Sequence, residues 1–141
     1  MGKKNRRGTP PKDNPSIKPD PIPDNPGCPT LSFRLVENGW GFENLTPDKA
    51  HAFLEKWVKR GSMTWEQIRQ APKHGLGSES LPAKQILPQL PNWMDPESKL
   101  IVFRHFDRLA QAGIRHGNVF EVIWIEPEYN KLYSHDGKNR R

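Results

Sequence analysis

Apolar and polar positions alternate or run together in three stretches near the end of the chain. These stretches, 99–106, 108–115 and 119–125, have the composition of β-strands. Between them lie only Asp107 and the pair Gly117-Asn118, and loops this short join antiparallel neighbours. The third stretch is apolar at six of its seven positions, which is typical of a central strand covered on both faces. The pattern predicts a three-stranded antiparallel meander.

Upstream, the hydrophobic spacing changes to that of helices. Thr46-Pro47-Asp48 combines an N-cap, a proline at the first helical position and an acid in the first turn. This predicts an amphipathic helix over 46–60, which Gly61 ends. Its apolar stripe contains Ala50, Phe53, Leu54, Trp57 and Val58.

Three further elements complete the prediction. Thr64 and Gln67 form a capping box that opens a second helix, and Pro72 ends it. The segment 80–87 is interpreted as a third, short helix, and 31–37 as a first strand with one solvent-exposed face. The order strand, helix, helix, then meander predicts an α+β fold with the helices on one sheet face and the other face at least partly open.

Composition divides the chain into three parts. Residues 1–30 hold eight of the fifteen prolines and almost no large apolar side chain, which predicts a disordered, basic, proline-rich arm. We expect one α+β domain over 31–135 and a disordered basic tail over 136–141.

Charge and cysteine content narrow the function classes. The net charge of +6 favours an anionic partner, and nucleic acid is favoured over a membrane surface. The same charge is equally consistent with a role in solubility alone. Cys28 is the sole cysteine, so an internal disulfide is excluded and a reducing cytoplasm is expected. We expect no membrane span, metal or cofactor, because the sequence lacks a long apolar run, a zinc cysteine pair, a phosphate loop and a dinucleotide fingerprint.

The candidate chemistry lies at the ends of the predicted strands. The meander places Arg104 and Arg108 at one end of the sheet and Arg115 and His116 at the other. The chain that leaves the last strand emerges at the first end, and it carries Lys131, Tyr133 and His135.

Arginines there could hold a phosphate bidentately while a histidine or tyrosine moves a proton. This is the composition of a metal-independent ribonuclease, in which a 2′-hydroxyl attacks the neighbouring phosphate. Equally, these groups could be solvated strand-end charges that Glu126 and Glu128 neutralise.

The pair Lys73-His74 is a separate candidate. It precedes two glycines in a loop after the second helix, where it could bind phosphate or supply a base. The alternative is an ordinary turn in which the glycines provide positive φ.

The segment 108–125 followed by Tyr133 resembles the C-terminal half of the RelE/ParE/HigB toxin superfamily. The resemblance implies a small bacterial toxin that an acidic antitoxin protein neutralises. RelE and HigB members cleave mRNA on the ribosome, and ParE members inhibit gyrase. It implies catalytic roles for Arg108, as the first residue of the third strand, and for Tyr133.

The family also has an arginine just past its last strand, where this chain has Glu126-Pro127-Glu128, so Lys131 or His135 would replace it. The segments 61–65, 73–77 and 132–135 are similar to those of small uncharacterised bacterial proteins, which implies a bacterial, mobile-element origin. Three hypotheses follow: an endoribonuclease toxin, a non-catalytic inhibitor of a protein, and a non-toxic accessory protein.

Overall fold

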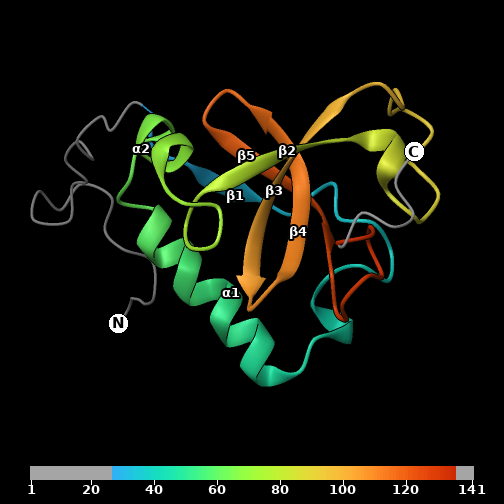
Figure 1. Cartoon of the computed structure of the whole chain (residues 1–141), viewed down its shortest axis with the longest axis horizontal. Helices are drawn as coiled ribbons and strands as arrows, with labels where there is room; N and C mark the ends of the chain where they lie inside the picture. The colour runs from blue at the N-terminus through green and yellow to red at the C-terminus, as the bar shows by residue number, and fades with distance from the viewer. Residues whose placement is uncertain (1–26, 136–141) are drawn as a thin grey trace, which may run out of the picture.

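The computed structural model describes residues 27–135, and these form a five-stranded mixed sheet with two α-helices (Figure 1). The strands are β1 (Thr30–Ser32), β2 (Ser78–Pro82), β3 (Lys99–Phe106), β4 (Leu109–His116) and β5 (Val119–Ile125). Their order in the sheet is β1-β5-β4-β3-β2, with β1 parallel to β5 and all other neighbours antiparallel. The expected α+β class is confirmed, but the sheet is larger than a three-stranded meander. Most of the expected arm and all of the expected tail lie outside the described residues.

The two helices begin where their capping residues predict. Helix α1 (Pro47–Arg60) follows Thr46, which has an extended backbone, and α2 (Trp65–Gln70) follows Thr64. The capping box is formed: Gln67 N donates to Thr64 Oγ1 at 3.0 Å, and Thr64 N donates to Gln67 Oε1 at 2.9 Å. Single 3-10 turns occur at η2 (Phe42–Asn44) and η3 (Ala83–Gln85).

The helix expected over 80–87 is wrong. Residues Ser78 to Pro82 instead pair with β3, and a helical turn follows only at Ala83–Gln85. The edge of β3 offers backbone donors and acceptors that this segment satisfies, a tertiary interaction that local sequence does not reveal. The strand expected over 31–37 is also shorter, because a turn closed by Val36 N and Phe33 O takes the chain out of the ladder after Ser32.

Both helices cover one face of the sheet, where aromatic side chains dominate. Trp57 stacks on Phe120 at 5.5 Å and meets Phe103 edge to face at 4.9 Å. The apolar stripe predicted for α1 is wider than the face that is buried, because Leu54 and Val58 are 52% and 77% exposed. The contact with the sheet uses the narrower face that carries Phe53, Trp57 and Arg60.

The opposite face is also buried, although it was expected to be partly open. Connecting segments cover it, since Ile86 and Met94 from the β2–β3 connection and Leu132 and Tyr133 from the C-terminal segment join its core. Figure 1 shows these segments on the side of the sheet away from the helices. The C-terminal segment therefore packs on this face, close to the strand ends.

A bulge in β5 explains its nearly unbroken apolar sequence. Ala112 pairs with Trp124 but Gly113 pairs with Val122, which leaves Ile123 as an additional residue. As a result Ile123 and Trp124 both belong to the core on the face away from the helices.

Candidate functional site

Arg108 lies in the two-residue turn between β3 and β4 rather than at the start of a strand. Asp107 precedes it with φ of 52°, a left-handed conformation that lets the hairpin close tightly. The sequence placed Arg108 in the strand because nothing in it marks which residues take up the turn. The arginine side chain is consequently exposed at the tip of the hairpin.

Four side chains form a continuous stack that begins at this arginine. The guanidinium carbon of Arg108 lies 4.9 Å from the ring centre of Tyr129, whose ring lies 4.5 Å from that of His135. The His135 ring in turn stacks on Tyr133 at 4.2 Å with 22° between the planes. We call Arg108, Tyr129, His135 and Tyr133 the aromatic stack. Cation–π and ring stacking hold these groups in register.

Glu126 fixes His135 within the stack. The Glu126 carboxylate is buried and accepts hydrogen bonds from Ala110 N at 3.1 Å and Leu132 N at 2.9 Å. His135 Nε2 lies 2.7 Å from Glu126 Oε1, and its side chain is only 4% exposed. Because a carboxylate accepts, Nε2 is the donor, and the neutral ring keeps its lone pair on Nδ1.

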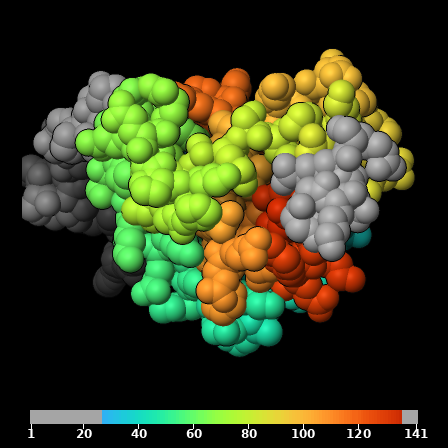
Figure 2. All heavy atoms as spheres, in the orientation of Figure 1, coloured from blue at the N-terminus to red at the C-terminus, as the bar shows by residue number. Residues whose placement is uncertain are grey.

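The far end of the stack is linked to the α2–β2 connection. The Tyr133 hydroxyl donates to Glu79 Oε2 at 3.4 Å, and Lys73 Nζ lies 3.5 Å from Glu79 Oε1. Tyr133 is buried, so this contact anchors its ring. Figure 2 shows the green α2–β2 connection, the orange β3–β4 turn and the red C-terminal segment exposed on the same side of the molecule.

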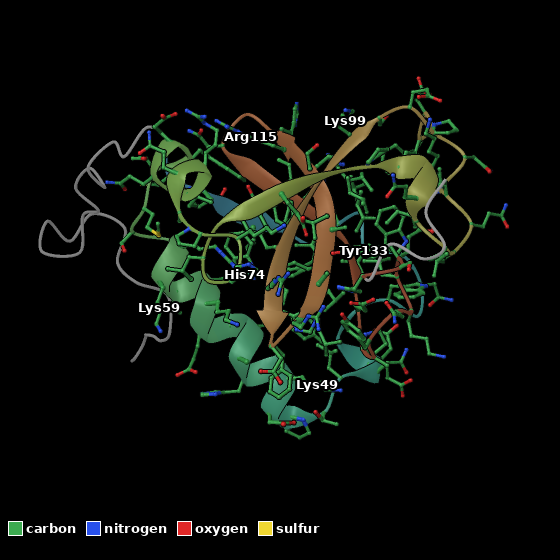
Figure 3. All side chains as sticks on the ribbon, in the orientation of Figure 1. Lys49, Lys59, His74, Lys99, Arg115 and Tyr133 are labelled. Atoms are coloured by element: carbon green, nitrogen blue, oxygen red, sulfur yellow. The ribbon has the colours of Figure 1, made fainter. Side chains whose placement is uncertain are left out.

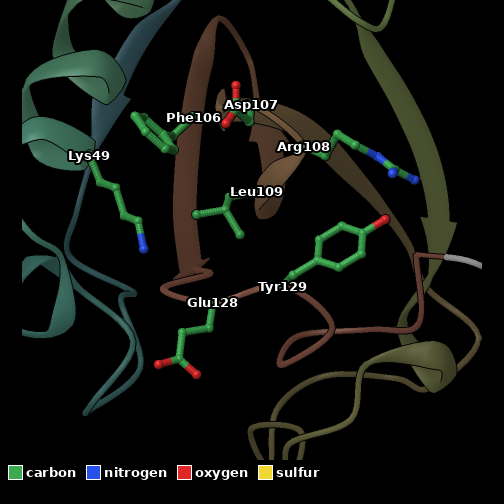
Figure 4. A pocket seen from close by; sticks show the side chains of 7 residues that line it. All are labelled: Lys49, Phe106, Asp107, Arg108, Leu109, Glu128 and Tyr129. Carbon is green, nitrogen blue, oxygen red and sulfur yellow. The ribbon is translucent and has the colours of Figure 1, made fainter.

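A pocket of about 410 Å³ opens beside Arg108 and Tyr129 (Figure 4). Its lining residues are Lys49, Phe106, Asp107, Arg108, Leu109, Glu128 and Tyr129. Lys49 reaches it from α1 and donates from Nζ to the carbonyl of Pro127 at 2.8 Å. The pocket therefore combines elements that are distant in sequence.

Positive charge accumulates behind the hairpin. Arg60 is buried between Trp57 and Phe103, with its guanidinium carbon 4.6 and 4.5 Å from their rings, and burial lowers its pKa to about 10. It donates to the carbonyl of Arg104 at 3.2 Å. Burial, followed by the charge of Arg60, also lowers the pKa of Lys56. Lys56, Arg60 and Arg104 are therefore close enough at the end of β3 to interact electrostatically, together with the carboxylate of Asp107.

Alternation along β3 places Arg104 on the same face as Leu100 and Val102, which is the face that carries Tyr133. Its side chain is half-buried. Lys131 is exposed in the segment between Tyr129 and Tyr133. Both cations therefore lie on the same side of the sheet as the stack.

The remaining predicted residues lie elsewhere. Figure 3 shows His74 and Arg115 well apart from Tyr133. His74 is exposed in the α2–β2 connection, and Arg115 lies over Trp65 at 4.5 Å and donates to the carbonyl of Gly117 at 2.7 Å. His116 is at that same opposite end of the sheet, on the other face, beside Trp93. The structure thus joins Arg108, His135 and Tyr133, but not His74, Arg115 or His116.

Sequence reasoning gave four residues of this region no catalytic or binding role: Lys49, Glu79, Glu126 and Tyr129. Tyr129 had the same topological signal as Tyr133, since both follow the last strand, and Glu126 was interpreted as a charge that neutralises arginine. Nothing local indicated that Lys49 and Glu79 approach the C-terminal segment.

Two further features of the described residues concern membrane insertion and metal binding. Residues 27–135 contain no helix with both the length and the apolar character that a membrane crossing requires. The same residues contain no cluster of three or more His, Cys, Asp or Glu side chains suited to hold a metal ion.

Comparison with known proteins gives no further guide to this site. No protein-family model matches the chain, and no match is found among curated proteins or solved structures.

Proposed function

We propose that the protein is a RelE-like toxin that cleaves mRNA without a metal ion, and that an acidic antitoxin neutralises it. The observation that carries the proposal is the position of Arg108 and His135 on either side of Tyr129 in the stack. The resemblance of 108–125 and Tyr133 to the superfamily supports it, as does the net charge of +6.

In this mechanism Arg108 binds the non-bridging oxygens of the scissile phosphate, and Arg104 adds positive potential. His135 Nδ1 takes the proton of the 2′-hydroxyl, whose oxygen attacks the phosphorus as the 5′-oxygen leaves. The 5′-oxygen leaves as an alkoxide that takes a proton from water, and His135 returns its proton to solvent, so the products are a 2′,3′-cyclic phosphate and a 5′-hydroxyl. The ring of Tyr129 fills the space between the guanidinium and the imidazole, so we place the scissile phosphate at the exposed edge of this ring.

Glu126 and Tyr133 hold the base in position in this proposal. The buried carboxylate of Glu126 fixes the tautomer of His135, and Tyr133 supports the other face of its ring. Tyr133 is buried and bonded to Glu79, so we assign it a supporting role. Lys131 and Lys73 are proposed to contact flanking phosphates.

The test is cleavage of an RNA oligonucleotide by the full chain in EDTA, alongside mRNA fragmentation after induction in a bacterial host. Arg108→Ala should slow cleavage about a hundredfold, because it removes a charge that stabilises the developing phosphorane. Arg108→Lys should also be slow, since an ammonium does not reproduce the planar fork of arginine. Arg69→Ala is the matched control, because Arg69 is exposed on α2 and pairs with Glu66.

Two results would reject this function. Growth arrest with intact mRNA would indicate inhibition of a protein target, as in ParE members, and absence of arrest and of cleavage would indicate an accessory protein. Cleavage that persists in Arg108→Ala would show that the site lies elsewhere, with His74 as the next residue to test.

A further inference from the structure

The pocket beside the aromatic stack has apolar walls and charged groups at its rim. Phe106, Leu109 and the ring of Tyr129 supply the apolar surface, and the rim carries both signs of charge. Apolar walls with a few oriented polar groups are the usual composition of a small-ligand site. In the mechanism above, Arg108 binds the phosphate, and the other charged groups at the rim of this pocket have no role.

Two of these groups, Lys49 and Glu128, line the same pocket and come from distant parts of the chain. Lys49 donates to the carbonyl of Pro127, the residue before Glu128, so its ammonium is held close to the Glu128 backbone. Figure 4 shows both charged ends on the same side of the pocket, across from Arg108. An ammonium has three donors, and the bond to Pro127 uses one of them. On this side of the pocket Glu128 therefore offers two carboxylate acceptors, and Lys49 offers donors that the bond to Pro127 does not use.

We propose that this pocket binds a guanine base next to the phosphate held by Arg108. Guanine carries two adjacent donors, N1–H and N2–H, followed by the acceptor O6 on the same edge. Glu128 accepts the two donors, and Lys49 donates to O6. The base lies against Leu109 and the edge of the Tyr129 ring, whose two faces are covered by Arg108 and His135. This proposal rests on the proposed function only in taking RNA as the source of the base.

The other bases fit this pair less well. Adenine has one exocyclic donor beside a ring acceptor, cytosine has one donor beside two acceptors, and uracil has a single donor between two acceptors. Each of them leaves a carboxylate oxygen of Glu128 facing an acceptor or without a partner. A site built for a hydrogen bond discriminates strongly against ligands that lack it.

The test is a nuclear magnetic resonance titration of the full chain with 3′-GMP, 3′-AMP, 3′-CMP and 3′-UMP in turn. GMP should bind at least tenfold more tightly than the other three nucleotides, and it should shift the methyl signals of Leu109. Glu128→Gln should remove this preference, because an amide presents one donor and one acceptor. Lys49→Met should weaken GMP binding by a similar factor.

Glu97→Gln is the control, because Glu97 is an exposed acid whose ion-pair partner is Lys84. Unchanged backbone spectra would establish that each variant is folded. Equal binding of the four nucleotides, or GMP binding that leaves Leu109 unshifted, would overturn the proposal.

Failure of this proposal and failure of the nuclease are separable. Selective GMP binding by a chain that cleaves no RNA would support the guanine pocket and reject the nuclease. Cleavage at all four bases together with unselective nucleotide binding would support the nuclease and overturn the guanine pocket.

Discussion

His105 and His135 show how the surroundings of a histidine decide its chemistry. His135 Nε2 bonds to the buried carboxylate of Glu126, which fixes the tautomer of the imidazole ring. His105 is fully buried against Phe53, and its Nε2 lies 2.9 Å from the carbonyl oxygen of Glu126. Burial lowers the pKa of His105 to about 4. His105 is therefore neutral at physiological pH, and its role is to pack in the core.

Acid should destabilise the protein through His105. Its folded-state pKa of about 4 lies below the unfolded value of 6.5, so the unfolded chain binds more protons between these values. The contribution to stability is complete above pH 6.5 and decreases as the pH falls toward 4, by on the order of 3 kcal/mol. Urea unfolding of His105→Gln at pH 7.5 and 4.5 should show a smaller loss than the wild type. His51→Gln, at an exposed position of α1, should lose as much as the wild type.

At the residue scale, the sequence predicted which side chains come together where strand order and direction alone decide their position. Arg108, Tyr133 and His135 were placed at one end of the sheet because the strands before them alternate in direction. Glu126 could not be identified in this way. Its role depends on hydrogen bonds from Ala110 and Leu132 that form only when the C-terminal segment folds back on the sheet.

Elements with local signals were predictable, and elements that depend on distant partners were not. Thr46 and Thr64 each mark a helix start, and both helices begin there. Strand β2 forms because β3 has a free edge, and its own serines and Pro82 give no periodic signal. Strand β1 was predicted over 31–37, but its extent depends on parallel pairing with β5, which covers only Thr30–Ser32.

Gly113 of β4 should not tolerate a side chain. A Cβ at this position would overlap the backbone oxygen of Glu121 in the neighbouring strand and lie 3.1 Å from the Phe120 ring. Gly113→Ala must therefore separate β4 from β5 at the bulge, and we expect a loss of about 3 kcal/mol or more in the free energy of unfolding.

Gly61 provides the control for this substitution. It ends α1 with φ of −62°, and an added Cβ would meet its nearest neighbours at 3.4 and 3.5 Å. Gly61→Ala should be neutral or stabilise by up to about 1 kcal/mol, because it restricts the unfolded chain. Urea unfolding of both variants checks the pair, and equal effects would contradict the close packing at the bulge.

At the scale of the whole molecule, the net charge of +6 predicted an anionic partner but not its location. The fold places Arg104, Arg108 and Lys131 on one side of the sheet, at the end where the C-terminal segment crosses it. Arg115 is at the opposite end and is engaged with Trp65 and Gly117. A bound RNA strand is therefore expected to follow the open side of the aromatic stack.

This arrangement predicts a salt dependence that identifies the surface. For single strands, the logarithm of the affinity falls by about 0.7 per phosphate contact for each tenfold increase in salt. Contacts from Arg104, Arg108 and Lys131 should give a slope of about −2 or steeper.

The probe is a 2′-O-methylated RNA oligonucleotide, which cannot be cleaved. Its binding is followed by fluorescence anisotropy between 50 and 200 mM salt, about the range over which such contacts weaken. Arg108→Ala should reduce the slope by about 0.7, whereas Arg69→Ala should leave it unchanged, because Arg69 is already paired with Glu66 on α2. A slope near zero, or one that Arg69→Ala reduces as much as Arg108→Ala, would show that RNA does not bind along the stack.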